Sequence, residues 1–463
     1  MRIARGQLAR SGRVPAGATR RPLRPAPRIV GGLALLVSLG TLLLMLPVSG
    51  RERPLAWNDA LFTAVSALSV TGLSTITASQ DLSLVGQILL LTGIQVGGVG
   101  FMVVAVVILR LLGRRIGLTE RVALSDSLGL LSPAAIVSLT KRVLTTVLLF
   151  EGLGALLLYL HWRTDERLSE WQALFYAIFH AVSAFCNAGF DLFTGTPGFP
   201  EGIPRDNLTL AIMGTLIFIG GLGIPVIADL LTYYRERRLS LHTRLTLIVV
   251  SFLVVGGTLG FWVAEIRSTG ALAGENPLRA LLICLFQSVS ARTAGFVGIA
   301  HFDELSAPSQ LLMITLMFIG CAPASMGGGI TTGTFAIMTI SLWSYARGLP
   351  TAQFGGRSLA AGTSRKAGAV LTISLLVTLL ASWLIAMTHD SPLEPVVFEV
   401  VSAFATCGLS LGLTTELNLF GQLVICLVMF WGRLGALTIV VAIAGQQRRT
   451  QLVQYPEEQI LIG

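Results

Sequence analysis

Charged residues are scarce in this sequence. Asp, Glu, Lys and Arg make up 12% of the 463 residues, whereas hydrophobic residues make up 53% and the mean hydropathy is +0.76. Because soluble globular domains carry about 25% charged residues, this composition excludes an ordinary soluble protein. Apolar runs of about 20 residues, enough to cross a bilayer, recur along the whole chain. We therefore predict an all-α polytopic membrane protein that lies in a lipid bilayer.

The sequence also lacks the usual patterns of metal, redox and nucleotide chemistry. Its five cysteines show no CxxC spacing, which argues against a disulfide framework or a zinc site, and its five histidines are scattered. No P-loop or dinucleotide-binding glycine pattern follows a predicted strand, so we expect this chain to bind no nucleotide itself. No nucleophile–base pair is apparent within the apolar segments, and we predict that the protein is not an enzyme.

Acidic residues are absent from the first 28 residues, which hold eight arginines. Segments 110–142, 235–244 and 347–366 are also rich in arginine, whereas the segments between them carry most of the acids. Since basic loops stay in the cytoplasm, we expect eight spans in a cell membrane, both termini cytoplasmic, and an outer face that attracts cations. The net charge of +9 then reflects sidedness and not a nucleic-acid partner. The predicted spans are 29–48, 84–112, 136–162, 208–231, 245–263, 311–343, 367–387 and 419–444.

One phrase occurs four times between the predicted spans. It begins with Phe, has Ser four residues later, and reaches Gly ten residues after the Phe, or nine in the third copy. The copies read FTAVSALSVTGLS from Phe62, FHAVSAFCNAGFD from Phe179, FQSVSARTAGFVG from Phe286 and FEVVSAFATCGLS from Phe398. The helix-like segment before each glycine, roughly 13 residues, is too short to span a membrane. We predict a re-entrant short helix and loop in each copy.

The apolar span after each phrase repeats as well. The similar stretches are GIQVGGVGFMV (93–103), IFIGGLGIPVI (217–227), MFIGCAPASMG (317–327) and MFWGRLGALTI (429–439), which place Gly98, Gly221, Cys321 and Arg433 at equivalent positions. Two phrases in the same order, four times, indicate an internal repeat. We predict four pseudo-symmetric helix–pore-helix–helix units around one axial pore, with short tails outside them. The predicted tails are 1–28 and 448–463, and the units are 29–115, 116–235, 236–346 and 347–447.

The glycine loops have a common physical explanation. Non-helical backbone at membrane depth persists only where protein or water satisfies its N–H and C=O groups, so four such loops need a shared polar interior. Glycine allows conformations in which carbonyl oxygens face that interior, and a ring of carbonyls can replace the hydration shell of a cation. The short helices also direct their partly negative C-terminal ends to the centre. The pattern predicts a cation-selective pore.

These motifs resemble those of the Trk/Ktr/HKT superfamily of potassium transporters. SVTGLS, FCNAGF, SARTAGF and ATCGLS are similar to its four filter loops, and SARTAGF, IQVGGVGFM, IGGLG and MFWGRLGALT resemble the Ktr-type membrane subunit over about residues 30–445. The resemblance implies that K+ is held at the filter residues. By position these are Val70, Thr71, Gly72, Asn187, Ala188, Gly189, Thr293, Ala294, Gly295, Thr406, Cys407 and Gly408.

The resemblance also implies a biological role. It indicates potassium-selective, channel-like uptake through one pore per subunit, in a homodimer gated by a cytoplasmic ring of nucleotide-binding (RCK) regulatory subunits. Glycine in all four loops is the pattern associated with K+ selectivity, and Gly72 argues against the Na+ transport that goes with a serine there in plant relatives. The sequence leaves open whether Na+ activates uptake or is cotransported.

Residues 320–334 interrupt the second span of the third unit with GCAPASMGGGITTGT. Close helix packing through small residues is one explanation. We favour a flexible gate loop beneath the filter, by its position and by resemblance to Ktr-type proteins, with Gly327, Gly328, Gly329 and Thr331 as gate residues. The family pattern has Lys after Gly-Gly-Ile, where this chain has Thr331. A charge expected near the gate is therefore missing.

Arg433 is the most informative single side chain. A charge within a span is costly and marks a pathway or a buried pair. Its repeat mates are all small, which places it on the pore side of the fourth unit, where a fixed positive charge below the filter would limit ion occupancy and act with the gate. The alternative is a pair with a buried acid such as Glu151. Arg292 and Asn187 are expected to brace their loops rather than face ions.

Two other classes of function compete with a potassium pore. A secondary cation transporter, coupled to Na+ or conducting it, also uses broken helices at mid-membrane, but with inverted two-part symmetry, which four parallel units do not fit. A membrane scaffold or an intramembrane enzyme would leave four glycine loops unexplained. A requirement for a co-ion gradient would favour the secondary transporter.

Overall fold

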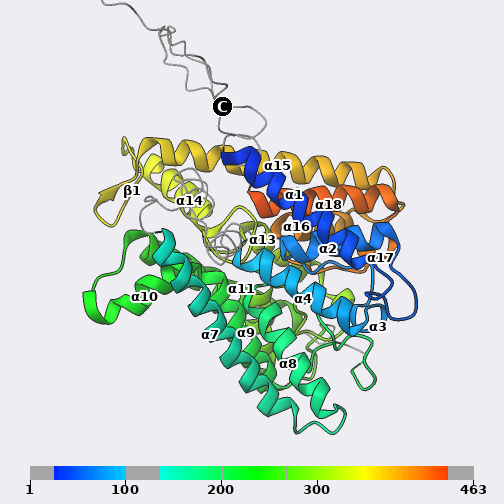
Figure 1. Ribbon diagram of the computed structural model, residues 1–463. Helices are drawn as coiled ribbons and strands as arrows, with labels where there is room; N and C mark the ends of the chain where they lie inside the picture. The colour runs from blue at the N-terminus through cyan, green and yellow to red at the C-terminus, as the bar shows by residue number, and fades with distance from the viewer. Residues whose placement is uncertain (1–24, 101–135, 200–201, 267–269, 436–463) are drawn as a thin grey trace, which may run out of the picture.

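The computed structural model describes residues 25–100, 136–199, 202–266 and 270–435. Helices dominate this part of the chain (Figure 1). Its β structure is a short hairpin of β1 (Gln353–Phe354) and β2 (Arg357–Ser358) and one isolated bridge. The prediction of a mainly helical protein is confirmed.

The helices follow one another in four groups of similar order. A leading helix of 20 to 27 residues precedes a short helix of 13 to 16 residues, and one or two further helices complete the group. Single turns α3 (Ala78–Asp81), η2 (Phe302–Glu304) and α17 (Leu413–Glu416) lie in the connections. The groups are α1 (Pro25–Leu44), α2 (Trp57–Ser69) and α4 (Leu84–Val99); α7 (Ile136–Trp162), α8 (Glu170–Phe185), α9 (Asn207–Leu222) and α10 (Ile224–Glu236); α11 (Leu241–Glu265), α12 (Pro277–Ser290), α13 (Ala307–Ile319) and α14 (Thr332–Ala346); and α15 (Ala361–Ala386), α16 (Leu393–Ala405) and α18 (Leu419–Leu434).

Side-chain caps fix where several of these helices begin. The first N–H groups of a helix have no partner within the helix, and a Ser, Asp or Asn oxygen can accept from them. Ser169 forms a full capping box with Gln172 at the start of α8. Single caps of the same kind are formed by Ser83 in α4, Asp206 in α9, Ser240 in α11 and Asn418 in α18. The third helices of three groups therefore start at defined points in polar connections.

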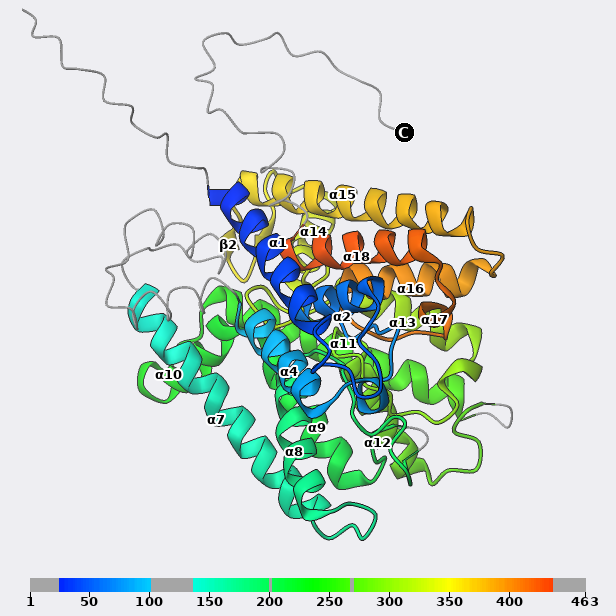
Figure 2. The ribbon, with the colours of Figure 1, turned by 45° about the vertical axis from the view of Figure 1, so that its right-hand side comes forward.

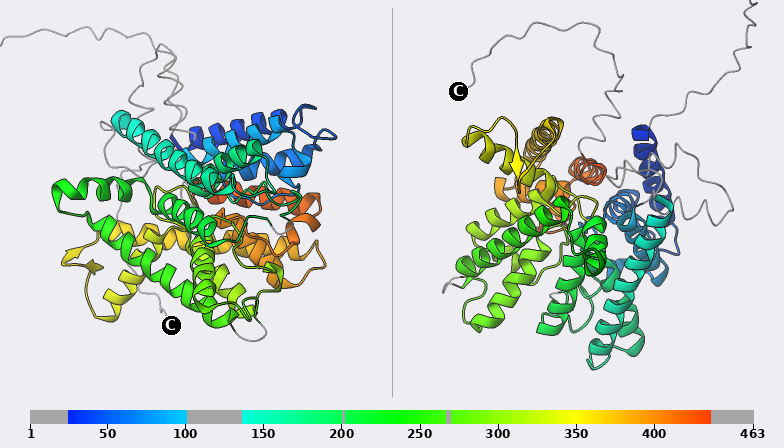
Figure 3. Two further views of the ribbon diagram at one scale, coloured as in Figure 1. Left: turned by 90° about the horizontal axis from the view of Figure 1, so that it is seen from below. Right: turned by 90° about the vertical axis from the view of Figure 1, so that its left-hand side faces the viewer.

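Helices of neighbouring groups pack in a closed circle. The third helix of each group packs against the short helix of the next group, namely α4 on α8, α9 on α12, α13 on α16 and α18 on α2. In the right-hand view of Figure 3, the colours accordingly pass around a common centre from blue through green and yellow to orange. Figure 2 shows α2 beside α1 and α4. The four short helices therefore lie toward one shared interior.

Two of the eight predicted spans are not single helices. The predicted break in span 311–343 is present, since α13 ends at Ile319 and α14 begins at Thr332. The prediction of one continuous span over 208–231 is wrong, because α9 and α10 meet at an angle of 98°. Gly223 has a φ of +85° at this point, and a proline lies in the first turn of α10. A left-handed residue and a missing N–H together end one helix and start another.

Membrane-spanning length varies among the helices. In the described residues, Val143–Trp162, Leu241–Glu265 and Gly362–Ala386 are long and apolar enough to cross a membrane, and the bent pair α9 and α10 is a fourth candidate if it counts as one span. Five more apolar helices have 10 to 17 residues. The predicted spans 84–112 and 419–444 extend beyond α4 and α18 into residues outside the described part, as do both predicted tails.

A glycine in α9 lets this helix approach the end of α8 closely. A methyl group on Gly220 would overlap the carbonyl oxygen of Phe185 and lie 3.0 Å from Asn187 Oδ1. We predict that Gly220→Ala lowers the thermal midpoint of the purified protein, because overpacking costs about 1–3 kcal/mol. Gly256→Ala in α11 is the control, since nothing lies within 4 Å of that position and alanine favours helix. A midpoint for Gly220→Ala equal to that of the control would contradict the close approach.

Candidate ion pathway

Each short helix ends in a loop with the same backbone conformation. A residue other than glycine adopts a positive φ, and a glycine with a positive φ follows two residues later. Since side chains disfavour this region of φ, its recurrence in four places is a built feature of the chain. We call residues 70–72, 187–189, 293–295 and 406–408 the ring loops. The φ values are +59° and +94° at Val70 and Gly72, +58° and +68° at Asn187 and Gly189, +79° and +77° at Thr293 and Gly295, and +52° and +95° at Thr406 and Gly408.

The ring loops touch one another in closed order. A methyl group on Gly72 would lie 2.5 Å from the carbonyl oxygen of Ala188, and one on Gly189 would lie 2.8 Å from that of Ala294. Methyl groups on the other two glycines would overlap carbonyl oxygens of the next loop. These remaining pairs are Gly295 with Cys407 and Gly408 with Thr71. The loops therefore follow each other in chain order around a closed circle, and only glycine fits at the contact points.

The carbonyl oxygens of the ring loops have no hydrogen-bond donors in the described part of the chain. Among the residues that the structure describes, none donates a hydrogen bond to the backbone oxygen of any ring-loop residue. The non-glycine residues of the ring loops are fully buried, and buried carbonyl groups normally have a partner. Buried acceptors without protein donors are groups that suit a cation stripped of water. The residues concerned are the twelve predicted filter residues, Val70, Thr71, Gly72, Asn187, Ala188, Gly189, Thr293, Ala294, Gly295, Thr406, Cys407 and Gly408.

The repeated serines tie each ring loop to its short helix. The backbone oxygen of each serine accepts from the N–H of the residue before the loop glycine, at 2.7 to 2.8 Å. The hydroxyl groups differ in pairs. Those of Ser66 and Ser402 accept from the loop glycine N–H, at 3.0 and 3.1 Å, whereas those of Ser183 and Ser290 donate to the carbonyl that follows the glycine. The sequence repeat thus corresponds to a repeated bond network.

Asn187 braces its loop, as expected from the sequence. Its amide is best oriented with the nitrogen toward the carbonyl oxygens of Ala184 and Ile217, at 3.1 and 3.2 Å, because the opposite orientation sets like groups against each other. Arg292 is also buried and donates to the carbonyl of Gly320, at 3.5 Å. The Arg292 side chain therefore connects the third loop to the interruption between α13 and α14.

That interruption, residues 320–331, lies directly against two ring loops, and we call it the break segment. A methyl group on Gly327 would overlap Thr293 Oγ1, and one on Gly328 would lie 2.6 Å from Thr406 Oγ1. Gly329 has a φ of +79° and contacts Gly320 across the segment. Three of the four predicted gate glycines and threonines therefore meet at the ring or at the turn beside it. Thr331 does not, since its hydroxyl caps α14 by accepting from the N–H of Thr334 at 3.4 Å.

The break segment is held by the bend between α9 and α10. Ala322 N–H donates to Gly221 O and Ile224 N–H donates to Ala324 O, both at 3.1 Å. A third bond joins Met326 N–H to Gly220 O at 3.3 Å. This bend and Met326 were not predicted from the sequence, although the stretch around Gly223 carries the glycine and proline that signal a helix break.

Arg433 bonds to backbone oxygens, and within the described residues none of its hydrogen bonds goes to an acid. Its guanidinium donates to the carbonyls of Gly97 and Gly98 at the end of α4, the second at 3.2 Å, and to that of Met326 in the break segment. Glu151 instead accepts from Gln95 Nε2 at 3.0 Å and from the Cys186 thiol at 3.5 Å. The alternative prediction, an Arg433–Glu151 pair, is not what the structure has. Arg433 lies where α4, α18 and the break segment meet.

A polar cavity of about 470 Å³ lies beside the ring and is lined in part by Gly189, Gly295, Asp191, Asp303 and Arg205. Asp191 follows its ring loop and accepts from His180, from Phe193 N–H and from Thr194. Burial alone would raise the pKa of Asp191, but the hydrogen bond and charge of His180, with those donors, lower it below the ordinary value. This carboxylate therefore stays charged beside the ring at neutral pH.

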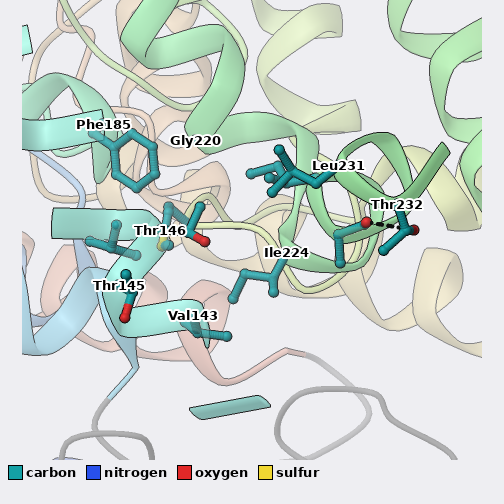
Figure 4. Close-up of a pocket in the computed structure, with 12 residues that line it drawn as sticks. Val143, Thr145, Thr146, Phe185, Gly220, Ile224, Leu231 and Thr232 are labelled. Atoms are coloured by element: carbon teal, nitrogen blue, oxygen red, sulfur yellow. Dashed lines mark hydrogen bonds between the residues drawn. The ribbon is translucent and has the colours of Figure 1, made fainter. Parts of the chain in front are cut away.

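A second cavity, of about 340 Å³, lies beside the break segment and is mainly apolar. It is enclosed by α7, α9, α10 and the end of α8, with Val143, Phe185 and Ile224 among its lining residues (Figure 4), and Met326 borders it. Thr232, at its far side in Figure 4, donates to the carbonyl of Ala228 within α10. The break segment therefore has a polar ring on one side and an apolar space on the other.

Comparison with known proteins agrees with this architecture. Residues 33–454 match the family described as TrkH, cation transport protein. The Ktr system potassium uptake protein B of Vibrio alginolyticus is 36% identical, over 97% of this chain and 98% of its own. The protein of the same name in Bacillus subtilis is 35% identical (93% and 95%), and the potassium/sodium uptake protein NtpJ of Enterococcus hirae is 33% identical (96% and 98%). The crystal structure of the potassium transporter TrkH from Vibrio parahaemolyticus has a similar fold, with a TM-score of 0.70 at 20% identity over 91% of this chain and 86% of that one.

The chain is therefore a membrane protein that belongs to the TrkH family of cation transport proteins. This confirms the family predicted from the four glycine phrases.

The bonds of Arg433 predict an effect of its removal. Arg433→Ala deletes donors to the break segment and to the end of α4, and charged hydrogen bonds contribute about 1.5–3 kcal/mol each. We expect rubidium flux per molecule of folded protein to rise about tenfold, measured in liposomes that contain the purified full chain. Arg347→Ala, which removes an exposed arginine from the end of α14, is the control and should leave flux unchanged. Unaltered flux in Arg433→Ala at equal protein content would contradict a role for these bonds.

Proposed function

We propose that this chain is the ion-conducting membrane subunit of a Ktr-type potassium uptake system. In this proposal the four helix groups are pseudo-symmetric helix–pore-helix–helix units around one pore, within residues 29–115, 116–235, 236–346 and 347–447. The observation that carries it is the closed circle of four ring loops, whose twelve carbonyl oxygens accept no hydrogen bond from any residue that the structure describes. The circular packing of α2, α8, α12 and α16 supports the same arrangement.

Potassium is the cation that this arrangement favours. Carbonyl oxygens carry partial negative charge and no formal charge, so they replace the hydration of an alkali cation without holding it as tightly as carboxylates would. The C-terminal ends of four short helices add partial negative charge at the same place. Glycine at all four contact points keeps the carbonyls close together. The names of two relatives, potassium uptake proteins of Ktr systems, support the choice of ion.

The break segment and Arg433 form the gate in this proposal. Gly327 and Gly328 contact the inner residues of two ring loops, and Arg433 holds Met326. An ion leaving the ring would meet this layer next, so the segment has to move or rearrange for conduction. The names of two relatives refer to a system, which supports a partner component. In this proposal the chain forms a homodimer with cytoplasmic termini, and cytoplasmic nucleotide-binding regulatory subunits act on the gate.

A Na+-coupled or Na+-conducting secondary transporter is the second candidate. It is favoured by one relative, which is named a potassium/sodium uptake protein. The two candidates differ in energetics, because a channel-like subunit conducts K+ down its electrochemical gradient and a coupled transporter requires movement of the co-ion. Rubidium uptake into liposomes with a fixed K+ diffusion potential, with and without a Na+ gradient, separates them. Uptake that depends strictly on the Na+ gradient would favour the second candidate.

Ring glycines predict how ion preference depends on the backbone. Gly72→Ser and Gly295→Ser each place a side chain where φ is positive and where a carbonyl of the next loop lies in contact. The left-handed conformation costs such a residue about 1–2 kcal/mol, so we expect the preference for K+ over Na+ to fall about tenfold. Competition of Na+ with rubidium uptake in liposomes measures this ratio.

Gly152→Ser is the matched control for these variants, because Gly152 lies in α7 with nothing within 4 Å. It should keep the ion preference of the unaltered protein. An unchanged ratio in both Gly72→Ser and Gly295→Ser, at normal protein content, would count against a ring that selects ions.

A further inference from the structure

A polar side chain follows the repeated phenylalanine in every helix group. We call these four the anchor residues, and each is fully buried on a short helix, with 0% exposure. Burying a polar group costs free energy unless it is hydrogen-bonded. Four buried polar residues at one position of a repeat therefore need a physical reason. The anchor residues are Thr63 in α2, His180 in α8, Gln287 in α12 and Glu399 in α16.

His180 holds the chain that follows the second ring loop. Its Nε2 lies 2.9 Å from Asp191 Oδ1 and 3.3 Å from the N of Leu192, and its Nδ1 lies 2.8 Å from the carbonyl oxygen of Tyr176. The imidazole of His180 is also enclosed by aromatic side chains, including Trp162 and Phe193, in edge-on or tilted contacts. The imidazole therefore has one fixed position, and it joins α8 to the residues immediately after Gly189.

Gln287 does the same for the third loop by a different chemistry. Its Oε1 accepts from the N–H of Gly298 at 2.9 Å, three residues after Gly295. Gly298 is packed closely here, since a methyl group on it would lie 2.6 Å from the ring of Phe286. The amide of Gln287 thus holds the backbone after the third ring loop against α12.

Glu399 anchors the fourth loop through two hydroxyl groups. Ser410 donates to one carboxyl oxygen at 2.7 Å, and Thr414 donates to the other. Ser410 lies two residues after Gly408, as Asp191 lies two residues after Gly189. In three loops a residue two or three positions after the glycine is therefore tied to the same position of the short helix.

Thr63 departs from this pattern in the first group. Its hydroxyl is buried and has no hydrogen-bond partner among the described residues, and its side chain is shorter than those of the other anchor residues. The corresponding stretch is held from a different position, because Thr75 donates to Asp59 Oδ1 at 2.8 Å, and Asp59 is partly exposed at the start of α2. The first ring loop is the one without a buried bond from its anchor residue.

We propose that His180, Gln287 and Glu399 are positioning residues for ion selection, which set the carbonyl spacing of the ring by fixing the outer end of three ring loops. This rests on the proposed function as a cation pore. In these three loops the serine bonds to the loop itself, and the anchor residue bonds to the chain that follows the loop glycine, so each loop is fixed at two points. A loop held at one end only would let its carbonyls move outward and accommodate ions of another size. The first loop is then the most compliant side of the ring.

Gln287→Met tests the proposal with little change in side-chain volume. It removes the acceptor for Gly298 N–H and leaves that group buried and unpaired. We expect the K+ over Na+ preference to fall about fivefold to tenfold, and the rubidium concentration for half-maximal uptake to rise, with protein content unchanged. Thr63→Val is the matched control at the equivalent anchor residue, because it removes a hydroxyl that makes no hydrogen bond in the described structure. It should leave the ion preference and the rubidium concentration for half-maximal uptake unaltered.

Ser410→Ala tests the same kind of bond from the loop side. Ser410 is partly exposed, so this variant is expected to fold even where Gln287→Met does not, and it should also lower the preference. The experiment uses the full chain in liposomes, with rubidium and Na+ as the ions.

Failure of this proposal and failure of the proposed function give different results. If the unaltered chain does not discriminate between rubidium and Na+, the proposed function fails. If it discriminates and Gln287→Met or, where that variant does not fold, Ser410→Ala keeps the full ratio, the positioning role is overturned. A fall in the ion preference of Thr63→Val as large as that of Gln287→Met would overturn it as well, because a general disturbance of the buried anchor positions would then explain both results.

Discussion

Backbone carbonyl oxygens without partners are the constraint on which the rest of this structure depends. A non-helical chain at membrane depth is costly unless its polar groups are satisfied, so loops of this kind can exist only around a shared polar space. The four short helices supply that space by ending at a common centre, and the circular packing of each third helix on the next short helix keeps them there. Glycine at the contact points then lets the oxygens of neighbouring loops come together. The circular packing of the helices and the circle of loops therefore meet the same requirement, a shared polar space for backbone groups without partners.

The four helix groups share backbone geometry and differ in side-chain chemistry. The serine hydroxyl accepts in the first and fourth loops and donates in the second and third. The third loop reaches its glycine one residue earlier than the others. Only the third group has the break segment, and the fourth has a cation where the others have small residues. Because each loop is held by a different set of contacts, the four sides of the circle differ in stiffness. Pseudo-symmetry allows a pore to be uniform toward the ion and specialised toward the protein.

The repeated elements could be predicted from the sequence because each loop has the same structural requirements, which select the same residue types at the same positions in all four copies. The Phe, Ser and Gly positions are fixed by packing, by a backbone bond and by a positive φ, and each admits few residues. The bend at Gly223 was missed because mean apolar character does not distinguish a straight span from two helices in series. The contacts of Arg433 with Met326 were also beyond the sequence, since they join residues 107 apart in chain position. The anchor residues occupy the same position of the repeat but differ in side-chain chemistry, so their common role is not evident from the sequence and requires the hydrogen bonds of the structure.

The inner layer of the pathway is built from hydrogen bonds between interrupted helices, and this determines how it can open. Arg433 donates to the end of α4 and to the break segment, while the break segment exchanges backbone bonds with the bend at Gly220 and Gly221. An apolar plug would have to leave its packing to let an ion through. Backbone bonds can instead be replaced one at a time by water, with little net change in free energy. The cavity beside Met326 provides space on one side, so a small displacement of this segment is enough to change the contact with Thr293 and Thr406. Under the proposed function, selection and opening belong to adjacent layers that share the same threonines.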